Sequence, residues 1–156
     1  MSDIRSELIS AIAPILSFLK GKEITPALAL ILEEKFPSGS ELLTTIKDLT
    51  LRGVAEDIFC TRGQPSLRFG RLLKPSEENS FSVDIVDMSC KGPGHTHPLG
   101  EVDLCFPVDP EALFDGSNKS WVVYGENSWH EPTVTKGRMI VLYFLPNGSI
   151  QFDPRK

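Results

Sequence analysis

The residues of this sequence best suited to chemistry are an H-x-H pair and a glutamate that closely follows it. His95 and His97 are two positions apart, and Glu101 lies four residues after His97. On an extended segment, residues i and i+2 project to the same face, so both imidazoles would point the same way. The bend offered by residues 98–100, Pro-Leu-Gly, would let the carboxylate fold back onto the same ion. The spacing therefore predicts a metal centre with these three ligands.

His130 is the third histidine, and it follows the glycine-containing segment 125–129. A lone histidine is more often a surface or hydrogen-bonded residue than a ligand, and the sequence pattern leaves that alternative open for His130. Two or three imidazoles with one carboxylate suit a divalent Fe, Mn, Co, Ni or Zn ion, and they leave coordination positions open for a substrate.

A β-rich half of the chain has to position these side chains. From about residue 55 the segments become short, β-branched and aromatic, and Gly, Pro, Asn and Asp separate them. Many short strands at regular spacing indicate a sandwich or barrel, not a parallel sheet with crossover helices. Residues 146–148, Pro-Asn-Gly, predict a tight turn that joins the last two strands as a hairpin. The predicted strands span residues 57–60, 67–73, 82–88, 100–108, 120–124, 138–145 and 149–152.

The first third of the chain is predicted to be helical. Apolar residues recur at helical spacing in three stretches, which span about residues 4–19, 26–35 and 42–49. Pro14 predicts a kink or a break in the first helix. The second helix opens with Thr25 as N-cap and Pro26 at the first helical position. The third opens with the S-x-x-E capping box of residues 38–41 and would end at Gly53.

The change from helical to β-rich sequence predicts two segments with different roles. The helices carry no catalytic signature, and their apolar faces have to pack on another surface. We therefore expect residues 1–54 to form a helical segment that packs on the barrel or on a dimer partner. Residues 55–156 are expected to form the barrel that holds the metal centre.

Composition limits the possible partners and locations. The net charge of −5 argues against a binder of duplex nucleic acid, which would need a basic surface to replace counterions. The apolar runs are far too short to cross a bilayer, and the first residues lack the features of a signal peptide. We therefore expect a cytoplasmic protein that has neither a membrane nor a nucleic acid as its partner.

The segment Gly94 to Glu101, GHTHPLGE, resembles the first motif of the cupin superfamily, in which two histidines and a glutamate bind a metal. Residues 125–132, followed by Gly137 and the turn at 146–148, resemble a loose second motif that carries the last histidine. This second motif lacks the customary proline-x-glycine ahead of the histidine. The resemblance implies a mainly β fold, the cupin-type double-stranded β-helix barrel or jelly roll, with His130 as a fourth ligand.

A narrower resemblance is to bacterial 4-hydroxylaminobenzoate lyases. It is carried by the runs GHTHPLGEVDLCFPVD and GRMIVLYFLPNGSIQFD, and by the helical N-terminal part and the Arg68/Arg71 region. It implies a metal-dependent conversion of 4-hydroxylaminobenzoate to 3,4-dihydroxybenzoate with release of ammonia, and a homodimer. The alternatives are a cupin dioxygenase or isomerase that acts on another small molecule, and a non-catalytic cupin that binds a small ligand.

Asp103 and Glu101 are the candidate catalytic residues, and Asp103 is the candidate for proton transfer. The two-residue period of a strand puts Glu101, Asp103 and Cys105 on one face, so Asp103 would face the barrel interior if Glu101 does. A buried Asp103 could shuttle protons, and the alternative is a solvated carboxylate at the barrel mouth. Cys105 is better interpreted as a small core residue than as a nucleophile.

An aromatic carboxylate substrate would need a cation and an apolar wall. Arg68 and Arg71 are candidate partners for the carboxylate, but they are three residues apart on one strand and therefore face opposite sides. Arg138 is a third candidate. Trp129, next to His130, and Tyr143 could wall an aromatic pocket, although core packing is the more frequent role of such residues.

Overall fold

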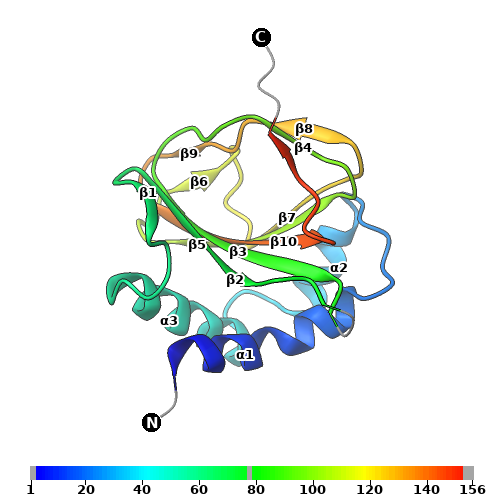
Figure 1. Cartoon of the computed structure of the whole chain (residues 1–156), viewed down its shortest axis with the longest axis horizontal. Helices are drawn as coiled ribbons and strands as arrows, with labels where there is room; N and C mark the ends of the chain where they lie inside the picture. Colours follow the sequence, from blue (N-terminus) through cyan, green and yellow to red (C-terminus); the bar gives the residue numbers. More distant parts are fainter. Residues whose placement is uncertain (1–2, 77–78, 153–156) are drawn as a thin grey trace.

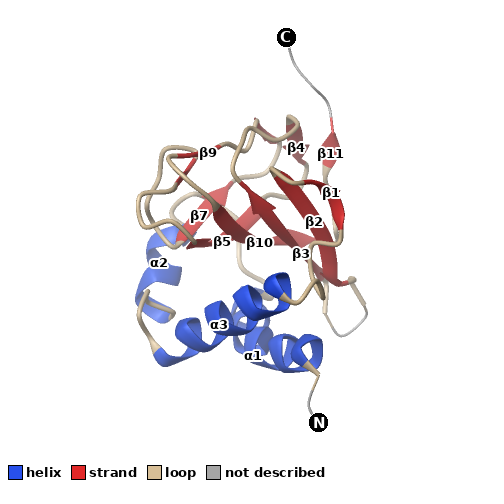
Figure 2. Cartoon of the chain, turned by 90° about the vertical axis from the view of Figure 1, so that its left-hand side faces the viewer, coloured by secondary structure: helices blue, strands red, loops and turns tan. Residues whose placement is uncertain are grey.

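The computed structural model describes residues 3–76 and 79–152 and shows three layers. A six-stranded sheet lies in the middle, three helices cover one of its faces, and short strands lie over the other (Figure 1). The view turned by 90° shows the helices packed together beneath the sheet (Figure 2). None of the helices in the described ranges combines the length and apolar character needed to cross a bilayer.

All strand pairs are antiparallel, and they form three sheets. The large sheet has the order β1 (Arg62–Gln64), β2 (Leu67–Leu73), β3 (Phe81–Met88), β10 (Met139–Pro146), β5 (Glu101–Pro107) and β7 (Trp121–Tyr124). The second sheet contains β11 (Gln151–Phe152), β4 (His95–His97) and β8 (Ser128–His130), and the third pairs β6 (Leu113–Phe114) with β9 (Val134–Thr135). The small sheets face the large one and close a barrel. The fold is therefore the mainly β, cupin-type barrel with N-terminal helices that the sequence predicts.

Strict alternation divides the large sheet into two faces. On the central strand β10, Ile140, Leu142 and Phe144 pack with the helices, whereas Met139, Val141 and Tyr143 belong to a separate cluster inside the barrel. Because successive side chains of a strand point to opposite faces, the same division holds along β5. There, Val102, Leu104 and Phe106 contact the helical layer, and Glu101, Asp103 and Cys105 face the interior.

The helices begin and end at somewhat different residues than the sequence predicts. Helix α1 (Ile4–Leu19) continues through Pro14 as one helix, so of the predicted kink or break the break is wrong. Proline costs a helix about 3 kcal/mol, and α1 buries a full apolar face that outweighs this cost. Helix α2 (Leu28–Lys35) begins two residues after Pro26. Helix α3 (Glu41–Ala55) has Ser40 as its N-cap, so the predicted capping box from Ser38 does not form.

The predicted strand over residues 57–60 is wrong, because this segment continues the end of α3. The N–H groups of Ile58 and Phe59 both donate to the carbonyl of Gly53, at 2.8 and 3.1 Å. Asp57 and Cys60 have φ values of 57° and 56°, in the left-handed region that an extended strand does not contain. These bonds and dihedral angles fold the segment into a tight turn under the sheet.

The turn at residues 146–148 forms, but the hairpin predicted from it is wrong. The N–H of Gly148 donates to the Leu145 carbonyl at 3.0 Å, which closes the turn. Both edges of β10 are already paired, with β3 on one side and β5 on the other, so no edge remains for a returning strand. The chain instead crosses to the second sheet, where β11 pairs with β4.

Gly53 lies inside α3 and does not end it, which generates a prediction about stability. A Cβ at this position would lie 2.2 Å from two ring carbons of Phe59, whose side chain is buried. Alanine normally favours a helix over glycine by about 1 kcal/mol. We expect Gly53→Ala to lower the free energy of unfolding instead, by about 1–3 kcal/mol, because the ring has to move in a packed core.

Urea denaturation of the purified protein measures this change. Thr45→Ala is the matched control, because Thr45 is an exposed position of the same helix. It should leave the free energy of unfolding unchanged or raise it by a few tenths of a kcal/mol. A Gly53→Ala variant at least as stable as the parent chain would contradict the packing of Phe59 on this helix.

Candidate metal centre

Three strands bring the predicted ligands to one point inside the barrel. His95 and His97 lie on β4 and point to the same face, and β8 pairs with β4 so that His130 lies directly opposite His95. Glu101 is the first residue of β5. It is reached through a turn in which the N–H of Gly100, at φ 91°, donates to the His97 carbonyl at 3.2 Å.

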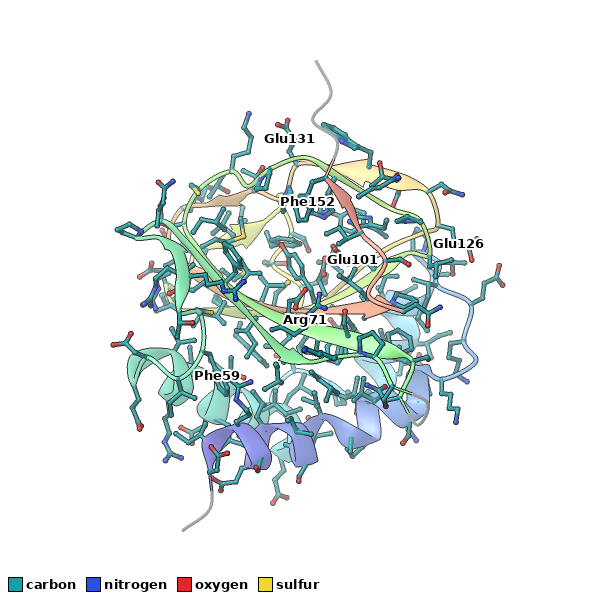
Figure 3. The ribbon with its side chains drawn as sticks, viewed as in Figure 1. Phe59, Arg71, Glu101, Glu126, Glu131 and Phe152 are labelled. Carbon is teal, nitrogen blue, oxygen red and sulfur yellow. The ribbon has the colours of Figure 1, made fainter. Side chains whose placement is uncertain are left out.

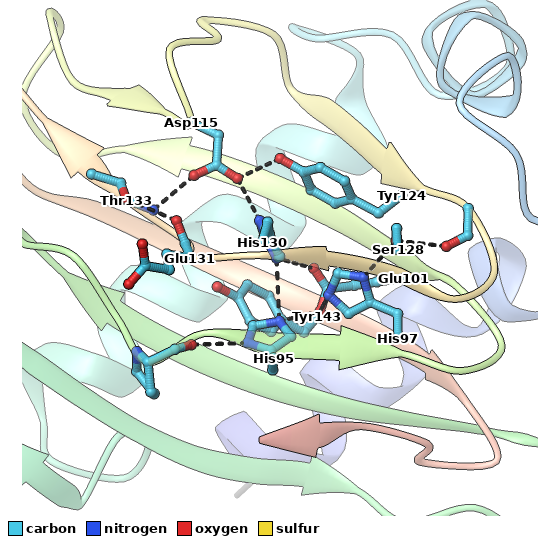
Figure 4. A network of polar contacts seen from close by, with 12 residues as sticks. His95, His97, Glu101, Asp115, Tyr124, Ser128, His130, Glu131, Thr133 and Tyr143 are labelled. Carbon is cyan, nitrogen blue, oxygen red and sulfur yellow. Dashed lines mark hydrogen bonds and ion pairs between the residues drawn. The ribbon is translucent and has the colours of Figure 1, made fainter. Parts of the chain in front are cut away.

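The side-chain ends of these four residues are close together and shielded from solvent. The Glu101 Oε1 atom lies 3.1 Å from His97 Nε2 and 3.4 Å from His95 Nε2, and Oε2 lies 3.5 Å from His130 Nε2. The Nε2 atoms of His95 and His130 are 3.2 Å apart. Glu101 and His97 are fully buried. Figure 4 shows the four side chains converging from three strands.

Each imidazole has an outer partner that fixes its proton on Nδ1. His95 Nδ1 lies 3.1 Å from the Pro93 carbonyl, which can only accept a hydrogen bond. His97 Nδ1 lies 3.0 Å from Ser128 Oγ, and that hydroxyl donates its own proton to the Gly125 carbonyl at 2.6 Å, so it accepts from His97. The Nδ1–H groups therefore point outward, and the Nε2 lone pairs point to the centre.

His130 also carries a proton on Nδ1, and the outer partner of this proton is a carboxylate. Its Nδ1 lies 2.7 Å from Asp115 Oδ2, and an ionised carboxylate only accepts hydrogen bonds. Burial alone would lower the pKa of His130, but its hydrogen bond to Asp115 and the nearby carboxylate of Glu101 outweigh this and raise the pKa to about 9. The position next to Glu101 therefore favours a positive charge, either a second proton on His130 or a metal ion in place of that proton.

The arrangement fits a transition-metal ion. The buried His97 Nε2 and both Glu101 oxygens have no hydrogen-bond partner of good geometry among the described residues, and a shared cation would satisfy them. All four ligand atoms lie within 4.8 Å of one another. Ligands about 2.1 Å from a shared ion are roughly 3 Å from each other, which matches the 3.1–3.5 Å approaches. These four residues can hold a metal.

The two buried acids of β5 differ in charge. Burial alone would raise the pKa of Glu101, but the three imidazoles around it hold that pKa well below 4.5. Asp103 is also fully buried, and neither of its carboxyl oxygens has a hydrogen-bond partner within the described ranges. Burial and the nearby charge of Glu101 raise the pKa of Asp103 well above 3.8. The surroundings therefore favour the ionised form of Glu101 and the protonated form of Asp103.

A cavity of about 740 Å³ opens beside the histidines. Its lining includes His95, Tyr143 and Arg71, together with Phe69 and Phe152 at its rim, which are 44% and 63% exposed. The Phe152 ring lies 5.6 Å from the His95 ring, edge to face. In the view of Figure 3, Glu101 lies between Arg71 and Phe152.

A row of polar side chains crosses the sheet between this cavity and the metal centre. Arg71 on β2 pairs in register with Asp84 on β3, which is opposite Tyr143 on β10, which is opposite Asp103 on β5. All four residues belong to the interior face. The Arg71 guanidinium donates to Asp84 from Nε at 2.8 Å and from Nη2 at 3.4 Å.

The structure places the other predicted substrate-binding residues away from this cavity. Arg68 faces the opposite side of β2, where its guanidinium lies 2.9 Å from Asp87. Arg138 binds the same carboxylate at 2.7 Å. Trp129 points away from His130 on β8, and its ring packs over Gly94, where a Cβ would lie 2.5 Å from a ring carbon.

The site also contains residues that the sequence did not suggest. Asp115 accepts hydrogen bonds from His130, from the Tyr124 hydroxyl and, at 2.8 Å, from the Thr133 N–H. Its sequence context, Asp-Gly, signals only a turn. Phe152 lines the cavity because β11 pairs with β4. The sequence predicted that this strand forms a hairpin with the preceding one, which would have placed Phe152 elsewhere.

Comparison with known proteins shows the family to which the chain belongs. A family model described as 4-hydroxylaminobenzoate lyase matches residues 10–152. A 4-hydroxylaminobenzoate lyase of Pseudomonas putida is 30% identical in an alignment of 168 positions that covers 96% of each chain. Another from Nocardioides sp. (strain LMS-CY) is 31% identical in an alignment of 158 positions that covers 94% of each chain. The crystal structure of the DMSP lyase DddQ from Ruegeria pomeroyi DSS-3 is 15% identical over 96% of both chains, with a TM-score of 0.47. By the family match and both relatives, the chain belongs to the 4-hydroxylaminobenzoate lyase family.

Proposed function

We propose that this lyase converts 4-hydroxylaminobenzoate and water to 3,4-dihydroxybenzoate and ammonia in a metal-dependent reaction. The observation that carries the proposal is the largely buried cluster of His95, His97, Glu101 and His130, of which His95 also lines an open cavity. The names of the two relatives supply the substrate class.

The reaction balances without an external oxidant. The N–O and C–N bonds of the hydroxylamine break, two C–O bonds form on the ring, and one water is consumed. The nitrogen gains two electrons as it becomes ammonia, and the ring loses two. This balance distinguishes the lyase from a dioxygenase on the same scaffold, which would consume oxygen.

The four cluster residues are proposed to hold a divalent Fe, Mn, Zn, Co or Ni ion. When bound, such an ion supplies Lewis acidity to a hydroxylamine oxygen or lowers the pKa of a water. Three imidazoles and one carboxylate leave further coordination positions open. The outward Nδ1–H bonds of His95, His97 and His130 keep the imidazoles oriented before a substrate arrives.

Arg71 is proposed to bind the substrate carboxylate. Of the three arginines that the sequence suggested, Arg68, Arg71 and Arg138, it is the one that lines the cavity beside His95, and it lies on the interior face of β2. Asp84 occupies the Nε–Nη2 edge of its guanidinium, and the five N–H donors of arginine leave a second edge for a carboxylate. Tyr143 and Phe152 provide aromatic surface between Arg71 and the metal ligands.

Asp103 is proposed to hold and transfer the proton that the leaving nitrogen requires. It is the acid two residues beyond Glu101 on the same interior face, and its oxygens are buried and unpartnered within the described residues. Glu101, surrounded by three imidazoles, is better placed to remain an ionised ligand. The two neighbouring carboxyl groups would thus divide ligand binding and proton transfer between them.

The first prediction concerns metal and oxygen. Protein treated with a chelator should form no 3,4-dihydroxybenzoate from 4-hydroxylaminobenzoate, and a divalent metal should restore the activity. Ammonia and the dihydroxy product should appear in equal amounts, at the same rate with and without oxygen. Full activity after metal removal would contradict the metal dependence, and oxygen uptake would favour a dioxygenase.

The second prediction concerns Arg71. Arg71→Ala should raise KM about 10–100-fold, because hydrogen bonds between charged groups contribute about 1.5–3 kcal/mol. Arg68→Ala is the matched control, since Arg68 lies on the same strand but faces the opposite side. It should change KM less than about threefold. Steady-state kinetics measure both, and equal effects of the two substitutions would contradict the assignment.

The third prediction concerns Asp103. Asp103→Asn keeps the shape of the side chain and removes the acid, so kcat at saturating metal should fall about 100-fold or more. Cys105→Ala, the next position on the same face of β5, serves as the control and should retain most of the activity. A metal titration before the assay separates loss of proton transfer from loss of metal. An Asn variant that turns over at the rate of the parent enzyme would exclude Asp103 as a proton donor.

A further inference from the structure

Asp115 is a partly buried carboxylate that contacts the candidate metal centre through His130. It lies just after β6, fifteen positions before His130, and its side chain is 17% exposed. Figure 4 shows it on the side of His130 that faces away from Glu101. Its φ of 49° is in the left-handed region, which costs a non-glycine residue energy unless surrounding contacts hold it.

Three donors hold this carboxylate in one orientation. Oδ1 accepts from the Thr133 N–H at 2.8 Å, and the N–H of Asp115 donates to the Thr133 carbonyl at 2.8 Å. Oδ2 accepts from the Tyr124 hydroxyl and, at 2.7 Å, from His130 Nδ1. The Tyr124 ring also packs on the His130 ring with centroids 4.2 Å apart. The position of the His130 ring is therefore set from outside the metal centre.

We propose that Asp115 is the positioning residue of the metal centre: its carboxylate binds His130 Nδ1–H and so keeps the Nε2 lone pair directed at the metal. The inference rests on the proposed metal centre and deepens it. Partners of this kind typically change metal affinity by 10–100-fold when they are removed. His95 and His97 are held by a backbone carbonyl and a serine hydroxyl, so His130 is the histidine whose orientation depends on a charged side chain.

Asp115→Asn tests this role because the amide cannot satisfy both neighbours. If the amide oxygen accepts from the Thr133 N–H, the NH2 group faces His130 Nδ1 and favours the tautomer with the proton on Nε2, in the metal centre. If the amide is turned around, the NH2 group faces a backbone N–H and the bond to Thr133 is lost. In both orientations His130 becomes a poorer ligand or is less firmly held.

The experiment is a double-mutant cycle that measures cobalt(II) affinity by competition with a chromophoric chelator, without substrate. In the parent chain, Asp115→Asn should weaken cobalt binding about 10–100-fold and change the visible absorption spectrum of the bound cobalt. In a His130→Ala background, the same substitution should change affinity less than about threefold, because the residue through which it acts is missing. Asp109→Asn is the matched control, since Asp109 also accepts a backbone N–H in a neighbouring turn, from Arg138 at 2.7 Å.

The outcomes separate positioning from general structural support. An equal loss of affinity in the parent and His130→Ala backgrounds, or no loss in the parent, would overturn the proposal. If Asp115→Asn does not fold, Asp115→Ser provides the same cycle, because it keeps a hydroxyl in the Thr133 turn and withdraws the carboxylate from His130. Cobalt affinity does not depend on the organic substrate, so the result stands even if the proposed lyase reaction is wrong.

Discussion

The structure depends on one buried carboxylate. Glu101 is fully enclosed in the barrel and remains ionised only because three imidazoles surround it. An isolated ionised carboxylate in an apolar interior is very unfavourable, so the strands that carry the histidines have to meet at its end. The pairing of β8 with β4, which places His130 opposite His95, supplies the third imidazole and meets this constraint.

The alternation of the large sheet lets one strand serve two layers. On β5 and β10, every second side chain packs against the helices, and the remaining ones supply the interior. The apolar face toward the helices can therefore provide stability. The face toward the barrel interior carries the row of polar groups from Arg71 to Asp103. A cavity lined by such groups would be hard to accommodate if the barrel interior had to provide the whole core.

Local sequence patterns predicted those features of the site that are set by residues close together in the chain. The spacing of His95, His97 and Glu101 was enough to expect them on one side of a bend, and alternation put Arg68 and Arg71 on opposite faces. Which arginine faces the cavity depends on the pairing of β2 with β3, which the sequence does not encode locally. Asp115 was missed for the same reason, since its partner His130 lies on another strand. The homodimer and the cytoplasmic location stay predictions.

The strand order has a consequence for the sequence of events during synthesis. Strand β4 carries two of the four proposed ligands, and both of its neighbours, β8 and β11, come much later in the chain. A ribosome that has translated His95, His97 and Glu101 has therefore produced ligands without the scaffold that aligns them. The wall of the site closes only when residues 151–152 have emerged, so the ligands on β4 are aligned after the helical layer and most of the large sheet are available to fold.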